Sequence, residues 1–446
     1  MFGLGIGGKA MRYILSVAVL VISGLVGACD TISEPEAMPE EQPLGLYDYP
    51  FIDPFAATVV GTPNGYRASL PKRIPVDEME ISVFEDREVP EVFWYNDRLK
   101  FSVARQKHRA PLIFNIAGTG AGHNSALMKV MQKAFYKAGF HVISLPSPTH
   151  SNFIVSASGT GVPGRVEDDA ADLYRVMELA YERVKERIEV SEFYLTGYSL
   201  GAWQAAFVAH LDEDAQVFDF AKVLMINPPV SLYSSIRILD HMLIDNVPGG
   251  TDGLDDYFER TFKAFIEVYK DHEFTNFGED FLYRAYTTYE PGEEALEALI
   301  GLSFRMSSNN MAFTSDVMSQ SGYVVPKSLE LTNTTSLTKY FKVGIRLSFE
   351  DYLDELFYPY FKAKDPSLTR EDLIEEASLE QIEDYLVRSP KIGLMTNEDD
   401  IILAPGEIDY LREVFGERAQ IFPTGGHCGN LAQRHVIAYM TDFFKG

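Results

Sequence analysis

The stretch of this sequence that most constrains its fold is 193–201, where a short apolar run leads into Gly-Tyr-Ser-Leu-Gly. The apolar residues 193–195 are typical of a buried strand, and the small and apolar residues from Ala202 onward predict a helix. A serine between a strand and a helix lies on a tight turn. Such a turn exposes the hydroxyl at the end of the sheet, close to the N-terminus of the helix. We therefore interpret Ser199 as a candidate nucleophile.

On both sides of this motif, apolar runs alternate with helical patterns. Strand-like runs occur at 112–116, 142–145, 193–195, 223–226, 392–395 and 420–422. Helical patterns occur near 124–138, 165–187, 199–211, 406–416 and 429–444. This alternation favours an α/β fold, in which a mostly parallel central sheet is covered by helices on both faces. Upstream of these elements, short alternating runs predict antiparallel strands at 79–84, 92–95 and 99–103.

The alternation stops at Pro229 and resumes at Pro390. The residues between them, 230–389, contain no strand-like run and are rich in aromatic side chains. A connection this long between two strands of one sheet is a structured insertion and not a loop. We predict a large, mainly helical cap over a core formed by 51–229 and 390–446. The aromatic residues fit the interior of such a cap, and they also fit a pocket for an apolar chain.

Two loops near the C-terminus contain the groups that a serine nucleophile needs. A serine hydroxyl attacks well only when a histidine accepts its proton and a carboxylate orients that histidine. Asp399 and Asp400 follow the strand-like run 392–395, and His427 follows the last run after two glycines. The sequence therefore provides a candidate base and two candidate acids.

The order Ser199, Asp400, His427, with the strand–turn–helix at the serine and the Gly-Gly-His loop, resembles the α/β-hydrolase superfamily. The resemblance covers about 110–230 and 390–446, with the cap inserted between them. It implies the α/β-hydrolase fold. It also implies that Ser199 is the nucleophile, that His427 is the general base and acid, and that Asp400 is the orienting acid.

The same resemblance extends to the less prominent parts of the site. Asp399 is the alternative acid, because it lies next to Asp400 in the same loop. Two backbone amides are expected to hold the developing oxyanion, one from Leu200 and one from Thr119 in the glycine-rich loop 117–122. This loop has Ala-Gly at 117–118 where the superfamily often has His-Gly.

The N-terminus predicts an exported, lipid-anchored protein. Lys9 and Arg12 accompany an apolar stretch at 13–26, whose length fits the core of a signal peptide over 1–28. The stretch ends in Val-Gly-Ala-Cys, which resembles a bacterial lipobox and implies cleavage before Cys29 and lipidation of its thiol. An ordinary secretory signal is the alternative.

The residues after this cysteine add to the prediction. Residues 29–50, rich in Glu and Pro, predict a tether. The expected location is the bacterial cell envelope, facing the periplasm. Asp30 resembles an inner-membrane retention signal, which favours the inner membrane over the outer membrane.

Charge and motif content exclude several function classes. The formal net charge of −26 argues against nucleic-acid binding, because phosphate contacts need a basic face. The glycine-rich loop 118–122 is not followed by the Gly-Lys-Ser/Thr of a phosphate loop. The histidines have no metal-ligand spacing, so we expect neither a metal nor a cofactor. The sequence has only two cysteines, and lipidation of Cys29 would leave Cys428 without a disulfide partner.

Together these features predict a serine hydrolase, esterase- or lipase-like, that cleaves a carboxylic ester or a related acyl bond through an acyl-enzyme. Its partners would be an acyl-containing small molecule or lipid as substrate and the membrane that holds the anchor. Two alternatives stay open: an acyltransferase that uses the same triad, and a non-catalytic envelope binding protein on a hydrolase fold.

Overall fold

The computed structural model describes residues 45–254, 256–257, 260, 282–283, 286–287 and 290–446. The predicted signal peptide 1–28, the predicted lipidation site Cys29 and most of the predicted tether 29–50 lie outside these residues, as does part of the aromatic insertion. No helix in the described part of the chain combines the length and the hydropathy that a membrane span requires.

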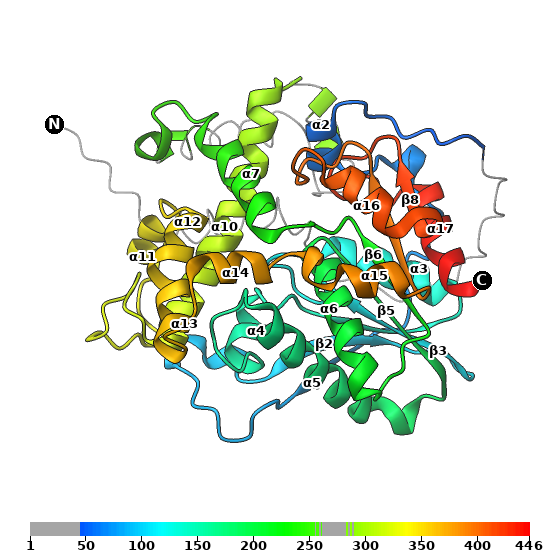
Figure 1. Ribbon diagram of the computed structural model, residues 1–446, viewed down its shortest axis with the longest axis horizontal. Coiled ribbons are helices and arrows are strands. Elements are labelled where there is room, and N and C mark those ends of the chain that lie inside the picture. Colours follow the sequence, from blue (N-terminus) through cyan, green and yellow to red (C-terminus); the bar gives the residue numbers. More distant parts are fainter. Residues whose placement is uncertain (1–44, 255, 258–259, 261–281, 284–285, 288–289) are drawn as a thin grey trace.

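A sheet forms the centre of the fold (Figure 1). It has eight strands in the order β1-β2-β4-β3-β5-β6-β7-β8. The strands are β1 (Asp77–Ile81), β2 (Leu99–Ala104), β3 (Ala110–Ile116), β4 (His141–Leu145), β5 (Val190–Tyr198), β6 (Lys222–Ile226), β7 (Ile392–Asn397) and β8 (Ala419–Phe422). β2 pairs antiparallel with β1 and β4, and all other neighbours are parallel. All six strand-like runs from 112 onward are strands.

Helices cover both faces of this sheet. The helices and 3₁₀ turns outside the long insertion are α2 (Pro54–Val60), η1 (Asn64–Tyr66), η2 (Glu91–Asn96), α3 (Ala126–Lys137), α4 (Ser151–Ser156), α5 (Val166–Val184), η3 (Lys185–Arg187), α6 (Leu200–Ala215), α16 (Glu407–Phe415), η6 (Gly416–Arg418) and α17 (Arg434–Lys445). Successive side chains of a strand point to opposite faces. Phe114 of β3 therefore joins the core under α5 and α6, while Ile113 joins the core under α3 and α17. This arrangement confirms the predicted α/β-hydrolase fold class.

The prediction of a strand at 92–95 is wrong, because these residues lie in the 3₁₀ helix η2. Val92 and Phe93 are both buried, whereas Trp94 and Tyr95 are exposed. Consecutive buried residues followed by consecutive exposed residues do not fit the period of two that a half-buried strand requires. Pro90 immediately precedes the helix, where its missing N–H costs nothing.

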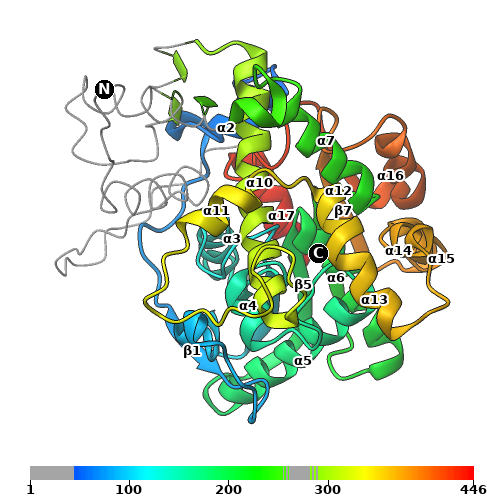
Figure 2. The ribbon, with the colours of Figure 1, turned by 90° about the vertical axis from the view of Figure 1, so that its left-hand side faces the viewer.

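The connection between β6 and β7 consists of helices, with no strand among its described residues. They are α7 (Leu232–Ile244), α10 (Glu293–Ser319), α11 (Thr338–Gly344), α12 (Phe349–Tyr352), the π-type turn η4 (Leu353–Phe357), α13 (Tyr358–Lys364), α14 (Arg370–Glu376), η5 (Leu379–Ile382) and α15 (Glu383–Arg388). Figure 2 views the molecule from the side of α10, α11 and α13. The mainly helical insertion expected for the fold is therefore present. The exact domain boundaries at 229 and 390 stay predictions.

A buried ion pair joins the two long helices of the insertion. The guanidinium of Arg305 in α10 donates to Asp240 Oδ1 in α7, with Nη2 at 2.6 Å, and the residue is 1% exposed. Asp240 Oδ2 accepts a hydrogen bond from the amide of Phe349 at 2.6 Å. A buried charge is tolerated only when it is paired and hydrogen-bonded, so these contacts fix α7, α10 and the start of α12 against one another.

Candidate active site

Ser199 lies on the turn between β5 and α6, with a φ of +54°. Its amide donates to the carbonyl of Ile226 at 2.8 Å, which ties the turn to the neighbouring strand β6. A Cβ atom on Gly197 would lie 2.3 Å from the carbonyl oxygen of Gly201. One on Gly201 would lie 2.3 Å from the carbonyl oxygen of Ile116 in β3. Only glycine fits at either position, so the spacing of the sequence motif follows from the close approach of three backbone segments.

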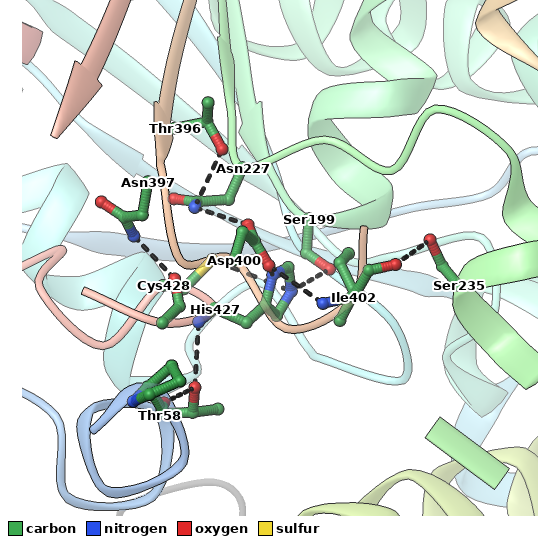
Figure 3. Close-up of polar contacts among 12 residues, drawn as sticks. Thr58, Ser199, Asn227, Ser235, Thr396, Asn397, Asp400, Ile402, His427 and Cys428 are labelled. Atoms are coloured by element: carbon green, nitrogen blue, oxygen red, sulfur yellow. Dashed lines mark hydrogen bonds and ion pairs between the residues drawn. The ribbon is translucent and has the colours of Figure 1, made fainter. Parts of the chain in front are cut away.

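The three side chains singled out from the sequence point toward one another (Figure 3). His427 Nε2 lies 2.8 Å from Ser199 Oγ, and His427 Nδ1 lies 3.0 and 3.2 Å from the two carboxylate oxygens of Asp400. With Nδ1 protonated, the imidazole donates to Asp400 and accepts from the serine hydroxyl. A histidine in this position can take the serine proton while the carboxylate holds its tautomer and orientation.

Asp400 is held by partners on both oxygens and is 6% exposed. Asn227, which follows β6, donates from Nδ2 to Asp400 Oδ2 at 2.8 Å. The amide of Ile402 donates to Oδ1 at 3.2 Å. Charge-assisted hydrogen bonds of this kind stabilise the ionised carboxylate and fix the direction in which it faces.

The neighbouring Asp399 does not contact the imidazole. Its carboxylate accepts hydrogen bonds from the amides of Gly425 at 3.2 Å and Gly426 at 2.9 Å. Burial raises the pKa of this carboxyl above its ordinary value. Thus one acid of the adjacent pair faces His427, and the other holds the backbone of the loop that carries His427.

The N-terminal helix α2 supports the histidine loop from the other side. The amide of His427 donates to Thr58 Oγ1 at 2.9 Å. A Cβ atom on Gly426 would lie 2.3 Å from the carbonyl oxygen of Pro54, so glycine is needed for the loop to pass this closely. Asn397 also donates from Nδ2 to the carbonyl of Gly426 at 2.7 Å.

Opposing effects act on the pKa of His427. Burial lowers the pKa of its imidazole, whereas Cys428 and the hydrogen-bonded Asp400 carboxylate raise it, and the resulting pKa lies well above the ordinary value. The side chain is 16% exposed. The sulfur of Cys428 lies 4.0 Å from Nε2.

A cavity of about 100 Å³ opens beside Ser199. Leu200 and Thr119, the predicted oxyanion donors, line the same cavity. Neither backbone amide has a hydrogen-bond partner in the part of the chain that the structure describes. The amide of Gly120 is occupied, because it donates to Thr149 Oγ1 at 2.8 Å. Two unoccupied amides beside a serine can stabilise a negative oxygen that forms there.

The insertion supplies most of the cavity wall. Its contributions are mainly aliphatic and aromatic, and they come from α7, α10, α12, η4 and α14: Leu232, Tyr233, Ile236, Leu239, Phe304, Met311, Phe349, Tyr352, Leu353, Phe357, Leu373 and Ile374. Ser235 of α7 also lines the cavity and donates to the carbonyl of Ile402 at 2.7 Å. The insertion is therefore fastened to the loop that holds Asp400.

Sequence reasoning missed Asn227 and Thr58. Asn227 follows an apolar strand of the parallel sheet, and a polar residue at the carboxyl end of such a strand is a recognisable signal. Thr58 lies in a helix that no motif connects with the site, so the sequence contains no such signal for it. Within the described residues there is no group of three or more His, Cys, Asp or Glu side chains placed to bind a metal ion.

No protein-family model matches this sequence, and no curated protein resembles it significantly. Among solved structures, the chain is similar to a serine hydrolase from Cycloclasticus zankles, with 14% identity over 83% of this chain and 99% of the other and a TM-score of 0.41. It is also similar to a carboxyl esterase from Bacillus coagulans, with 13% identity over 84% and 99% of the two chains and a TM-score of 0.40. Similarity at this level assigns neither an activity nor a substrate.

Proposed function

We propose that this protein is a serine hydrolase that cleaves a carboxylic ester or a related acyl bond. The observation that carries the proposal is the continuous chain of contacts from Ser199 Oγ through the His427 imidazole to Asp400, with distances of 2.8 and 3.0 Å. The positive φ of Ser199 supports it further. Positive φ angles are uncommon at residues other than glycine and cluster at functional sites.

In the proposed mechanism, His427 Nε2 removes the proton from Ser199 Oγ as the oxygen attacks the substrate carbonyl. The amides of Leu200 and Thr119 hold the resulting oxyanion. His427 then donates the proton to the leaving oxygen, and the C–O bond of the ester breaks to leave an acyl-enzyme. Water attacks this intermediate with His427 again as the base, which releases the acid and restores the serine hydroxyl.

The apolar wall that the insertion contributes favours an acyl substrate with a medium or long chain. Burial of each additional methylene group stabilises the bound substrate by about 0.8 kcal/mol. Activity on p-nitrophenyl esters is therefore expected to rise from acetyl to decanoyl. A sharp preference for acetyl would contradict this substrate class.

A fluorophosphonate probe tests the proposed nucleophile. The wild-type protein should be labelled, and Ser199→Ala should abolish labelling while circular dichroism shows an unchanged fold. Ser308→Ala is the matched control: Ser308 also lines the cavity, but its hydroxyl donates within α10 to the carbonyl of Phe304. Absence of labelling in the folded wild-type protein would favour the non-catalytic binding alternative.

The same purified protein distinguishes hydrolysis from acyl transfer. The proposal expects free acid as the main product when a p-nitrophenyl ester is supplied together with an alcohol or an amine. Transfer of most of the acyl group to the added nucleophile would favour the acyltransferase.

We also propose that Cys29 is lipidated and anchors the protein in the cell envelope, facing the periplasm. In a bacterial host, the full chain should be recovered with the membranes and should incorporate labelled fatty acid. Cys29→Ala should lose the label. Equal incorporation by the wild type and by Cys29→Ala would contradict the anchor.

A further inference from the structure

A single carboxylic acid lines the cavity beside Ser199. Asp169, in the first turn of α5, is 2% exposed and lies in the wall. No lysine, arginine, histidine or second acid joins it there among the residues that the structure describes. A carboxyl group in an otherwise mainly apolar wall is costly to bury unless something binds it.

The contacts of Asp169 use only part of its hydrogen-bonding capacity. Its Oδ2 accepts from the amide of Gly164 at 2.9 Å and from Gln204 Nε2 at 3.4 Å. Its Oδ1 has no partner in the described part of the chain. Gln204 Oε1 is buried and is also without a partner there. The hydrogen bond to the Gly164 amide accounts for Oδ2. No contact among the described residues accounts for Oδ1.

The charges around Asp169 do not favour its ionised form. Burial raises its pKa well above the ordinary value, and the nearby carboxylates of Asp172 and Asp168 raise it further. The amide of Gly164 and the side chain of Gln204 act in the opposite direction but do not reverse the shift. A neutral carboxyl group can both donate and accept a hydrogen bond.

We propose that Asp169 determines substrate specificity by binding, through Oδ1, a hydroxyl group on the acyl chain that occupies the cavity. This inference rests on the proposed function, because it names the substrate class of the same site. A hydroxyl group suits the position, since it can accept from a neutral carboxyl and donate to an ionised one. An ammonium group would have to leave water for a mainly apolar wall that contains a single carboxyl group.

The place of the hydroxyl group along the chain follows from the helix geometry. Gln204 follows Ser199 by five residues in α6, which corresponds to about 7.5 Å along the helix axis at 1.5 Å per residue. Asp169 contacts Gln204, so we expect the hydrogen-bonding position to lie several bonds from the reacting carbonyl carbon.

Hydrolysis of matched p-nitrophenyl esters tests the inference. Decanoate is compared with hydroxydecanoates that carry the hydroxyl at successive carbons. For at least one remote position, we expect kcat/KM to exceed that of decanoate by about tenfold, mainly through KM, the effect of one net hydrogen bond. Equal values for decanoate and every hydroxydecanoate would overturn the inference.

Variants identify the residue responsible. Asp169→Leu should remove the preference, measured within this variant as the ratio of kcat/KM for the hydroxylated ester to kcat/KM for decanoate. Asp172→Asn is the matched control, because Asp172 lies on the next turn of α5, holds the amide of Gly159 at 2.6 Å and does not line the cavity. It should retain the preference. A preference that persists in folded Asp169→Leu would overturn the assignment, and if this variant does not fold, the wild-type comparison decides.

A binding measurement separates this inference from the proposed function. Ser199→Ala is titrated by calorimetry with decanoate and hydroxydecanoate methyl esters. Tighter binding of a hydroxylated ester supports the inference even if wild-type protein hydrolyses no ester, which would contradict the proposed function alone. Equal binding of both esters overturns the inference even if hydrolysis is efficient.

Discussion

Thr58 and His427 are 369 residues apart in the sequence and are joined by a hydrogen bond of 2.9 Å from the histidine amide to the threonine hydroxyl. The same hydroxyl donates to the carbonyl of Pro54 at 2.7 Å. A helix from the N-terminal part of the chain thus fixes the backbone of the residue proposed as the catalytic base.

Thr58→Val should therefore lower kcat by about tenfold, because the amide of His427 loses its acceptor and the loss of such a bond costs about 1–3 kcal/mol. Thr58→Ser keeps the hydroxyl and should retain nearly full activity. Steady-state kinetics of both variants on one p-nitrophenyl ester checks this. If Thr58→Val is as active as Thr58→Ser, the hydrogen bond does not position the base.

The two adjacent acids should differ strongly when each is replaced by the isosteric amide. Asp400→Asn removes the acceptor for His427 Nδ1–H and should lower kcat by about 10⁴-fold, as expected for an imidazole held in the wrong tautomer. Asp399→Asn leaves that contact intact and should lower kcat far less, because its effect is confined to the stability of the histidine loop. Comparable losses in kcat would argue against Asp400 as the orienting acid.

The pH dependence of kcat/KM should reflect the raised pKa of His427. The imidazole must be neutral to accept the serine proton, so activity is lost as pH falls through its pKa in the free enzyme. The acidic limb should accordingly lie above about 6.5, the ordinary value for histidine. Two esters of different leaving groups should give the same limb, and a limb at or below 6.5 would contradict the upward shift.

Gly201→Ala should be severely destabilising, although alanine is the better helix former by about 1 kcal/mol. The added Cβ would lie 2.3 Å from a backbone oxygen of β3, which cannot move aside as a side chain could. We expect a loss of about 3 kcal/mol in the free energy of unfolding, measured with urea. Gly65→Ala, where nothing lies within 4 Å of the new atom, should be nearly neutral.

The predicted strands at 112–116, 142–145, 223–226 and 392–395 are correct because a strand buried on both faces is almost continuously apolar, a pattern that needs no knowledge of its neighbours. The pattern at 92–95 is different. Four apolar or aromatic residues in a row fit either a short strand or a 3₁₀ turn, and only the partial exposure of Trp94 and Tyr95 distinguishes the two. Local composition does not determine that exposure.

The acid–base pair illustrates a second limit. The proximity of Ser199, Asp400 and His427 could be predicted, because the parallel sheet brings the carboxyl ends of β5, β7 and β8 to one edge. Which of two adjacent carboxylates faces the imidazole depends on how the loop turns after β7. That turn is set by contacts from Asn227 and from the glycines of the histidine loop, which are distant in the sequence.

The hydrogen bond from Ser235 to the carbonyl of Ile402 links substrate fit to catalysis. Ser235 forms part of the cavity wall, where a change of side chain alters which substrates fit. Its hydroxyl also supports the loop that carries Asp400. A substitution of Ser235 that changes which substrates fit is therefore expected to change the reaction rate at the same time.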